Sequence, residues 1–163
     1  MRPFVGVSRS ICPRYFGPLP QPFLPLHPAK YAEMLSAKMQ EAGVNVWLIN
    51  TGWSAGPYGV GARIKLKYTR AMITAILKGQ LDEVDYEQHP IFGFFMPKYC
   101  PNVPTEILDP MNTWLQKGAY IGKAIQLAHS FHINFEKYAN EASQQIMEGG
   151  PLIDQHHHLE EHI

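Results

Sequence analysis

The sequence predicts an α/β fold, a mixed sheet with flanking helices, and three observations predict it. The apolar run 44–49 leads into a glycine-rich segment, as a strand covered on both faces leads into a turn. Segments with apolar residues at helical spacing lie on both sides of that run. Farther along, residues 84–87 alternate apolar and polar side chains, which is typical of a strand. We therefore expect a central strand at 44–49 with helices packed against its sheet.

The first helix is predicted over Pro28–Ala42. Pro28 suits the first turn, where its missing N–H costs no hydrogen bond, and Gly43 is placed to end the helix in the left-handed conformation. His27 is expected to form a turn or a cap and not to bind metal, because no second ligand lies near it. The face expected to be buried comprises Tyr31, Met34, Leu35, Met39 and Ala42.

The segment 50–61 contains four glycines, and four cationic residues follow it before a second helix begins. The glycines are Gly52, Gly56, Gly59 and Gly61, and the cations are Arg63, Lys65, Lys67 and Arg70. Such an arrangement is common at anion sites, because glycine lets the backbone approach a phosphate and free N–H groups at a helix start favour negative charge. The same pattern also fits a plain connection between a strand and a helix.

The second helix is predicted over 68–77, with Gly79 as its stop. Thr69 lies in its first turn, where a hydroxyl can cap the helix or meet a ligand. Trp53 is expected to pack, with stacking on a ligand as the alternative. The apolar face of this helix is expected to comprise Ile73, Ile76 and Leu77.

Two adjacent strands, a loop and a third long helix are predicted beyond residue 80. The alternating residues 84–87 and the apolar run 91–96 flank a turn at His89-Pro90, which favours a hairpin. Residues 100–110 form a proline-rich loop, in which Asp109 is placed to cap a helix beginning at Pro110.

The last helix is predicted over 119–138, and its two histidines, His129 and His132, are expected to pack and not to bind metal. Its apolar face follows the helical period through Ile121, Ala124, Ile125, Ala128, Phe131 and Phe135.

Composition excludes several classes of function. The chain has 163 residues, of which 45% are hydrophobic and 17% charged, so one globular domain with a sizeable core is expected. Fourteen basic and 14 acidic residues give no net charge, which argues against a dedicated nucleic-acid binder. No apolar run approaches the roughly 20 residues that span a bilayer. Cys12 and Cys100 favour free thiols in a reducing, cytoplasmic setting.

Three stretches of the sequence resemble the ATP-dependent phosphoenolpyruvate carboxykinase family. PFLPLHPAKYAEML is similar to the family's PFLPLHPTKYAEML. NTGWSAGPYGVGARIKLKYTRAMITA is similar to its NTGW-x-x-GPYGVG-x-R-[IM]-K-L-K-YTRAMITA, and HPIFGFFMPKYCPNVPTEILDPMNTW to its HPVFGL-x-IP…C-x-GVP-x-EILDPRNTW. The resemblance runs from about residue 21 to residue 138. It implies a C-terminal fragment of a longer enzyme, forming part of the C-terminal nucleotide-binding lobe.

The resemblance also divides the chain into three parts. Residues 1–20 carry arginines and prolines but no acid and do not match the family, so they are expected to be an irregular leader, with a transit peptide as the weaker alternative. Residues 21–148 form the carboxykinase-like segment. Residues 149–163, with four histidines at 156–158 and 162, are expected to be a flexible tail that binds nickel or zinc only adventitiously.

The resemblance implies nucleotide contacts at Arg63, Ile64 and Thr69. A guanidinium can hold a phosphate or stack on a base, Ile64 can pack on the adenine face, and Thr69 can hydrogen-bond an edge. Taken without the resemblance, the same residues are a surface arginine, a core isoleucine and a helix cap.

Three positions depart from the family pattern. Ala55 stands where the family commonly has glycine, and its methyl group adds strain if the backbone there needs a positive φ. Ala62 replaces a lysine of the phosphate-handling loop, and Met111 replaces an arginine.

The resemblance implies a carboxy-lyase of gluconeogenesis, which converts oxaloacetate and ATP to phosphoenolpyruvate, ADP and CO2. The reaction needs ATP as substrate and Mg²⁺ or Mn²⁺. The family's G-x-x-x-x-G-K-[ST] loop and metal ligands lie upstream of the matched segment, and the sequence contains no such loop. We therefore assign no catalytic residue and no metal ligand, and we expect the chain alone to be inactive.

Three hypotheses stay open. The chain is the C-terminal piece of a carboxykinase, a non-catalytic module that retains part of a nucleotide pocket, or a structural piece that only completes a larger domain. The expected partner is a small-molecule nucleotide, and neither nucleic acid nor a membrane is expected. The sequence indicates no oligomeric state.

Overall fold

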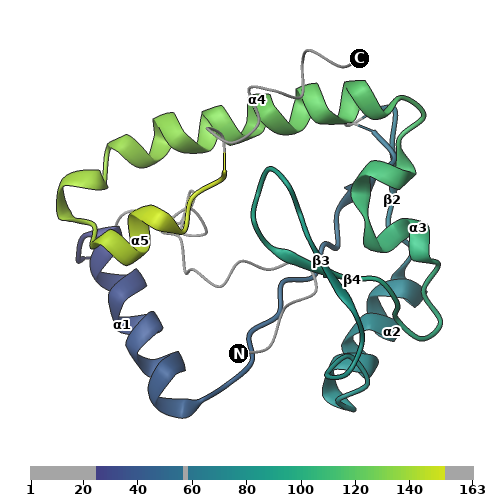
Figure 1. Cartoon of the computed structure of the whole chain (residues 1–163), viewed down its shortest axis with the longest axis horizontal. Helices are drawn as coiled ribbons and strands as arrows, with labels where there is room; N and C mark the ends of the chain where they lie inside the picture. Colours follow the sequence, from purple (N-terminus) through teal and green to yellow (C-terminus); the bar gives the residue numbers. More distant parts are fainter. Residues whose placement is uncertain (1–24, 57–58, 153–163) are drawn as a thin grey trace.

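The computed structural model describes residues 25–56 and 59–152, which form helices and two small two-stranded sheets (Figure 1). Helix α4 spans Lys117–Glu136 and runs along one side of the molecule. Helix α1 lies near one end of α4, together with the short helix α5, while α2 and the strands lie near its other end. The remaining bounds are α1 Pro28–Ala42, β1 Trp53–Ser54, β2 Ala62–Arg63, α2 Leu66–Leu77, β3 Tyr86–Gln88, β4 Phe95–Pro97, α3 Thr105–Leu108, the 3-10 turns η3 Pro110–Thr113 and η4 Ala139–Glu141, and α5 Gln144–Glu148.

The α/β class is confirmed at the level of mixed helices and strands, but the predicted central strand at 44–49 is wrong. Within the described residues this segment is neither helix nor strand, and both sheets are formed by other residues. Val44 is 54% exposed, while Trp47 and Ile49 pack against the core that α2 helps to form. The apolar residues of this segment are thus explained by contact with the core beside α2, and not by burial on both faces of a strand.

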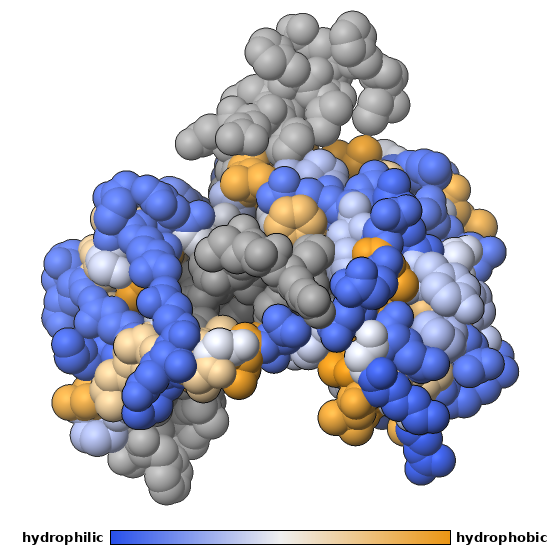
Figure 2. All heavy atoms as spheres, turned by 60° about the horizontal axis from the view of Figure 1, so that its bottom comes forward, coloured by the Kyte–Doolittle hydropathy of each residue, from blue (hydrophilic) through white to orange (hydrophobic). Residues whose placement is uncertain are grey.

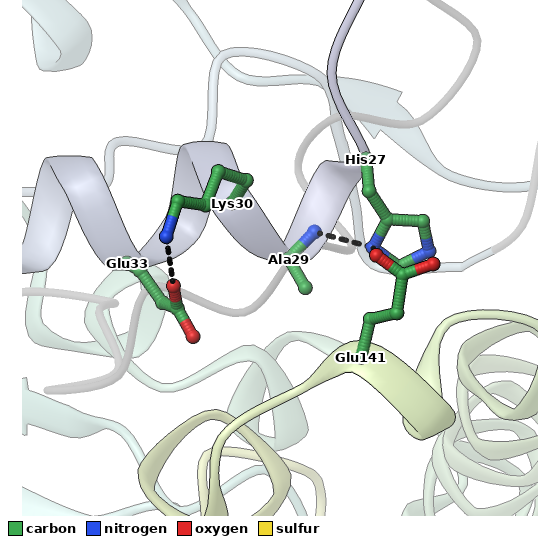
Figure 3. A network of polar contacts seen from close by, with 5 residues as sticks. All are labelled: His27, Ala29, Lys30, Glu33 and Glu141. Atoms are coloured by element: carbon green, nitrogen blue, oxygen red, sulfur yellow. Dashed lines mark hydrogen bonds and ion pairs between the residues drawn. The ribbon is translucent and has the colours of Figure 1, made fainter.

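Helix α1 has the predicted bounds and both predicted ends. Gly43 adopts φ 59° and closes the last turn, and the backbone N–H of Ala29 donates to Nδ1 of His27, 3.4 Å away. Figure 3 shows this cap, with the Glu141 carboxylate beside the same ring and the Lys30–Glu33 pair on the next turn. The cap role of His27 is therefore confirmed.

The predicted buried face of α1 is wrong. Its buried residues are Ala29 and Ala32, whereas Met34 and Leu35 are 50% and 44% exposed. Ala32 packs with Phe135 of α4 and Ile146 of α5, so the small residues of the helix form its contact. Helical spacing alone ranks large apolar side chains highest and misses a contact made through alanines.

Helix α2 begins two residues before the predicted start and ends as predicted. The N–H groups of Gly79 and Gln80 donate to the carbonyls of Ile76 and Ala75, which is the Schellman pattern of helix ends. The predicted face is mostly wrong, because Ile73 and Leu77 are exposed and only Ile76 packs against the core. The buried residues of this helix are Thr69, Met72 and Ala75.

The predicted hairpin is confirmed, with shorter strands. Strands β3 and β4 pair antiparallel, with Gln88 opposite Phe95. The apolar run 91–94 does not extend β4, because it forms the turn in which the N–H of His89 donates to the carbonyl of Phe94 at 2.7 Å. Ile91 of this turn instead packs against Ala124 and Ala128 of α4, forming a separate small core.

The cap at Asp109 is confirmed: its Oδ1 accepts the N–H of Met111 at 3.0 Å, at the start of η3. The loop predicted over 100–110 contains one further short helix, α3. The last long helix is confirmed as α4, with Ala124, Ala128 and Phe135 buried. His129 and His132 are exposed, so their predicted packing role is wrong.

Several predictions lie outside the described residues, namely the leader 1–20, Cys12 and the histidines of the tail. Cys100 is buried, and burial raises the pKa of its thiol. At the other end, the N–H of Leu152 donates to the carbonyl of Ile91 at 2.7 Å. In the part of the chain that the structure describes, no helix is long and apolar enough to cross a membrane.

Candidate nucleotide site

The predicted site is built on a tight ribbon in which β1 and β2 pair. Trp53 lies opposite Arg63, and the N–H of Ile64 donates to the carbonyl of Gly52 at 2.9 Å. A Cβ atom on Gly61 would lie 2.5 Å from the carbonyl oxygen of Ser54 and 2.6 Å from that of Gly56. Only glycine fits there, so the glycine-rich sequence fixes a close approach of backbone to backbone.

Ala55 adopts φ 66°, a left-handed conformation that costs a residue with a Cβ about 1–2 kcal/mol. The strain expected from the alanine at this position is therefore confirmed. The hydroxyl of Thr113 holds the segment in place: it accepts hydrogen bonds from the N–H of Ala55 and from the Ser54 hydroxyl, each at 3.1 Å, and donates to the carbonyl of Pro110 at 2.7 Å. The short turn η3 thus anchors the loop.

An apolar cavity of about 660 Å³ lies beside the ribbon. The segment 48–56, the hairpin of β3 and β4, the α3–η3 segment and α4 all contribute to its wall. Its volume lies within the range of small-molecule sites, which are mostly apolar with a few polar groups. The polar members of the wall are Asn50, Ser54, Tyr120 and Lys123.

The three predicted site residues have different surroundings. Ile64 is half-buried and lines the cavity. Arg63 is exposed on β2, at the position before it. Thr69 is buried in α2, at 8% exposure, and its N–H donates to the carbonyl of Lys65. The structure therefore brings Ile64 to the cavity and leaves Arg63 available to solvent at its side.

A sequence model of phosphoenolpyruvate carboxykinase matches residues 11–106. The chain belongs to the phosphoenolpyruvate carboxykinase (ATP) family. Proteins named phosphoenolpyruvate carboxykinase (ATP) are 58% identical over 133 residues in Flavobacterium johnsoniae, 55% over 147 in Christiangramia forsetii and 54% over 132 in Brevibacillus brevis. These matches cover 82%, 90% and 81% of this chain but only 25%, 27% and 25% of the relatives. The chain therefore spans about a quarter of the length of these carboxykinases.

Trp53 and Tyr120 line the cavity and were not predicted as site residues. Trp53 is 43% exposed, and stacking on a ligand stays the alternative that the sequence left open. Burial raises the pKa of Tyr120 to about 12, and the nearby Asp109 carboxylate adds to this effect. The hydroxyl therefore stays protonated at neutral pH. Tyr120 is spaced by four residues from Ala124 and by eight from Ala128, so the three lie on the same face of the helix. This spacing is the signal in the sequence that could have placed Tyr120 on the cavity wall.

The described residues contain no cluster of metal ligands. Over residues 25–56 and 59–152, no group of three or more His, Cys, Asp or Glu side chains could hold a metal ion. Ala62, the position of the replaced lysine, is exposed in β2, and Met111 lies half-buried in η3. The cations that the resemblance implies at these two positions would lie on β2 and on η3.

Proposed function

We propose that this chain supplies the nucleotide-binding part of the C-terminal lobe of a phosphoenolpyruvate carboxykinase, in which oxaloacetate and ATP give phosphoenolpyruvate, ADP and CO2. The single observation that carries the proposal is that Ile64 lines an apolar cavity beside a tight glycine ribbon, with Arg63 exposed at the adjacent position. The names of the relatives support ATP as the nucleotide. A carboxykinase of this kind would work in the cytoplasm.

Each proposed contact has a chemical role that its surroundings allow. Ile64 would pack on the face of the adenine ring, and the exposed ring of Trp53 in the same wall offers a second flat surface. The guanidinium of Arg63 would meet the base or ribose end of ATP, where it can stack or donate in a fork. Thr69 is buried in the first turn of α2, so its hydroxyl would hydrogen-bond only to a base edge that reaches the start of this helix.

Mg²⁺ or Mn²⁺ would neutralise the phosphates, which extend away from this end of the nucleotide. The groups that hold the metal belong to the part of the family sequence that precedes the matched segment. The residues of this chain therefore bind and orient the base and ribose, and they take no part in proton or phosphoryl transfer.

Titration of the chain with ATP, followed by amide shifts in NMR, tests the proposal. A partial pocket makes few contacts, so we expect dissociation constants of about 1 mM or weaker, which corresponds to about −4 kcal/mol. The amides of residues 52–56 and 59–64 should shift, and Arg63→Ala should weaken the response. Arg70→Ala is the matched control, because Arg70 is also an exposed arginine but lies on α2, away from β2 and from the cavity-lining Ile64.

An absence of shifts in the ribbon, or equal loss in both arginine variants, would refute nucleotide recognition. The remaining hypothesis, a purely structural piece, predicts the same melting temperature with and without ATP. A melting curve therefore separates a residual nucleotide-binding module from a piece that only completes a larger domain.

A further inference from the structure

The wall of the cavity is mostly apolar, and its polar members include Ser54 of β1. The outer surface is different: on the face shown in Figure 2, hydrophilic residues predominate and hydrophobic ones lie in separate small groups. Isolated polar groups in an apolar site set the orientation and the specificity of a ligand. The hydrogen bonding of Ser54 therefore bears on what the cavity accepts.

The hydroxyl of Thr113 determines where the Ser54 proton points. A hydroxyl has one proton to donate and two lone pairs to accept with. Oγ1 of Thr113 lies 2.7 Å from the carbonyl oxygen of Pro110, which has no proton, so Thr113 must be the donor there. The N–H of Ala55 occupies one of its lone pairs at 3.1 Å. The second lone pair takes the proton of the Ser54 hydroxyl, also at 3.1 Å.

The Ser54 hydroxyl therefore has no proton left for a ligand and offers only lone pairs. Ser54 is half-buried and lines the cavity, whereas Thr113 is not among the described residues of its wall. We propose that Ser54 is a specificity-determining residue, an acceptor that selects ligands with an N–H or O–H donor at this part of the wall. Thr113 is the positioning residue that fixes this polarity. The inference rests on the nucleotide site proposed above.

The turn that holds Thr113 is itself fixed by hydrogen bonds. The Asp109 carboxylate accepts the N–H of Met111 at 3.0 Å and the side-chain amide of Asn112 at 2.8 Å. The contact between Thr113 and Ser54 then joins η3 to β1 across 59 positions of the sequence. Because both ends of this contact belong to ordered turns, the acceptor is in place before a ligand arrives.

Two kinds of donor on the proposed nucleotide can meet Ser54, the exocyclic amine of adenine and the ribose hydroxyls. Ile64, in the same wall, is proposed to pack on the adenine face, which favours the amine. ITP has an oxygen acceptor in place of this amine, which would face the Ser54 oxygen with no proton between them. Because a hydrogen bond is then lost, we expect ATP to bind about three- to ten-fold more tightly than ITP.

Amide shifts in NMR titrations with ATP, ITP, 2′-deoxy-ATP and 3′-deoxy-ATP test the inference. Ser54→Ala should remove the preference for ATP over ITP. Thr113→Val should also remove it although Ser54 is still present, because the released hydroxyl can then donate as well as accept. Thr113→Ser should restore the preference. A Ser54-dependent preference for ATP over either deoxynucleotide, and not over ITP, would support the acceptor with a ribose hydroxyl as its partner.

The matched control is Thr51→Val, which alters an exposed threonine of the same segment that is not among the described wall residues and should keep the preference. Without ligand, hydrogen exchange at the Ala55 amide should accelerate in Thr113→Val and not in Thr113→Ser, and equal exchange in both overturns the inference. If Thr113→Val unfolds, Ser54→Ala decides alone.

Two results separate this inference from the proposed function. A parent chain that binds ATP but shows no Ser54-dependent preference among the four nucleotides overturns the inference and leaves the nucleotide site standing. A parent chain that binds none of them overturns both.

Discussion

The Nε2 atom of His89 lies 2.7 Å from the hydroxyl oxygen of Tyr120 and joins the β3–β4 hairpin to α4. The Nδ1 atom of the same ring accepts the N–H groups of Ile91 and Phe92, each at 3.2 Å. Nδ1 therefore carries no proton, and Nε2–H donates to the tyrosine hydroxyl. The imidazole is only 2% exposed, so a neutral, fixed histidine holds the wall of the cavity together.

Tyr120→Phe tests this link. The variant removes one partner of a buried N–H, and such a loss costs about 1–3 kcal/mol of unfolding free energy. Urea denaturation should therefore show a lower midpoint at unchanged slope. Tyr99→Phe is the control, because Tyr99 is 57% exposed and should change stability little. Equal midpoints for the two variants would contradict a stabilising role for the pair.

Alkaline pH should destabilise the fold through two tyrosines. Burial, then Asp82 and Cys100, raise the pKa of Tyr86 to about 12, and burial with Asp109 does the same for Tyr120, from an ordinary value of 10.0. A folded pKa above the unfolded value gives stability that is complete below about pH 10 and lost between about pH 10 and 12.

Melting temperature measured against pH, together with phenolate absorbance, checks this expectation. The double variant Tyr86→Phe/Tyr120→Phe should lose less stability over that range than the parent chain, whereas Tyr99→Phe should follow the parent. A parent melting temperature that stays constant up to pH 12 would contradict the raised pKa values.

Ala55→Gly should stabilise the protein. Glycine removes the cost of φ 66°, about 1–2 kcal/mol, but loses part of that gain to the greater freedom of the unfolded chain. We expect a net gain of about 0.5–1 kcal/mol in denaturant unfolding. Ala62→Gly is the control, because Ala62 is an exposed strand residue without a positive φ and should lose stability. A destabilised Ala55→Gly variant would show that the ribbon does not store this strain.

Gly61→Ala should have the opposite effect. Its Cβ would lie 2.5 Å from the carbonyl oxygen of Ser54, so the ribbon must open, at a cost of about 1–3 kcal/mol. Gly122→Ala in α4 is the matched control: no atom lies within 4 Å of the added Cβ, and alanine favours the helix by about 1 kcal/mol. Thermal unfolding of the two variants should therefore shift in opposite directions, and a neutral Gly61→Ala would refute the close approach.

Local signals in the sequence predicted helix ends and turns well. Pro28, Gly43 and Asp109 act through their own backbone and near neighbours, so their roles could be inferred directly. Burial could not be inferred in the same way. The alanines of α1 and the inner side of α2 are buried because of what packs against them, and the run 44–49 remains unpaired because pairing needs a neighbouring strand. Of the residues that line the cavity, Ile64 could be named from the resemblance. Tyr120 could not, because it lies on a helix that is distant in sequence from the glycine-rich segment.

The last prediction is that this chain alone does not catalyse the carboxykinase reaction. Phosphoryl transfer depends on positioning and on stabilising charge, and the loss of one preorganised donor costs roughly 10²–10³ in rate. Among the described residues, the cavity wall contains one cation, Lys123, whose Nζ donates to Gln126 at 2.8 Å. In the binding mode proposed above, Arg63 would meet the base or ribose end of the nucleotide, so it would not replace a phosphate loop or a metal site.

Incubation of the purified chain with oxaloacetate, ATP, Mg²⁺ and Mn²⁺, with phosphoenolpyruvate followed in a coupled assay, should give no rate above buffer. The full-length Flavobacterium johnsoniae carboxykinase, assayed in parallel, provides the positive control. Turnover by the chain alone that survives a second purification and that Arg63→Ala reduces would contradict the prediction. Such turnover would place a catalytic group within this chain, where we assign none.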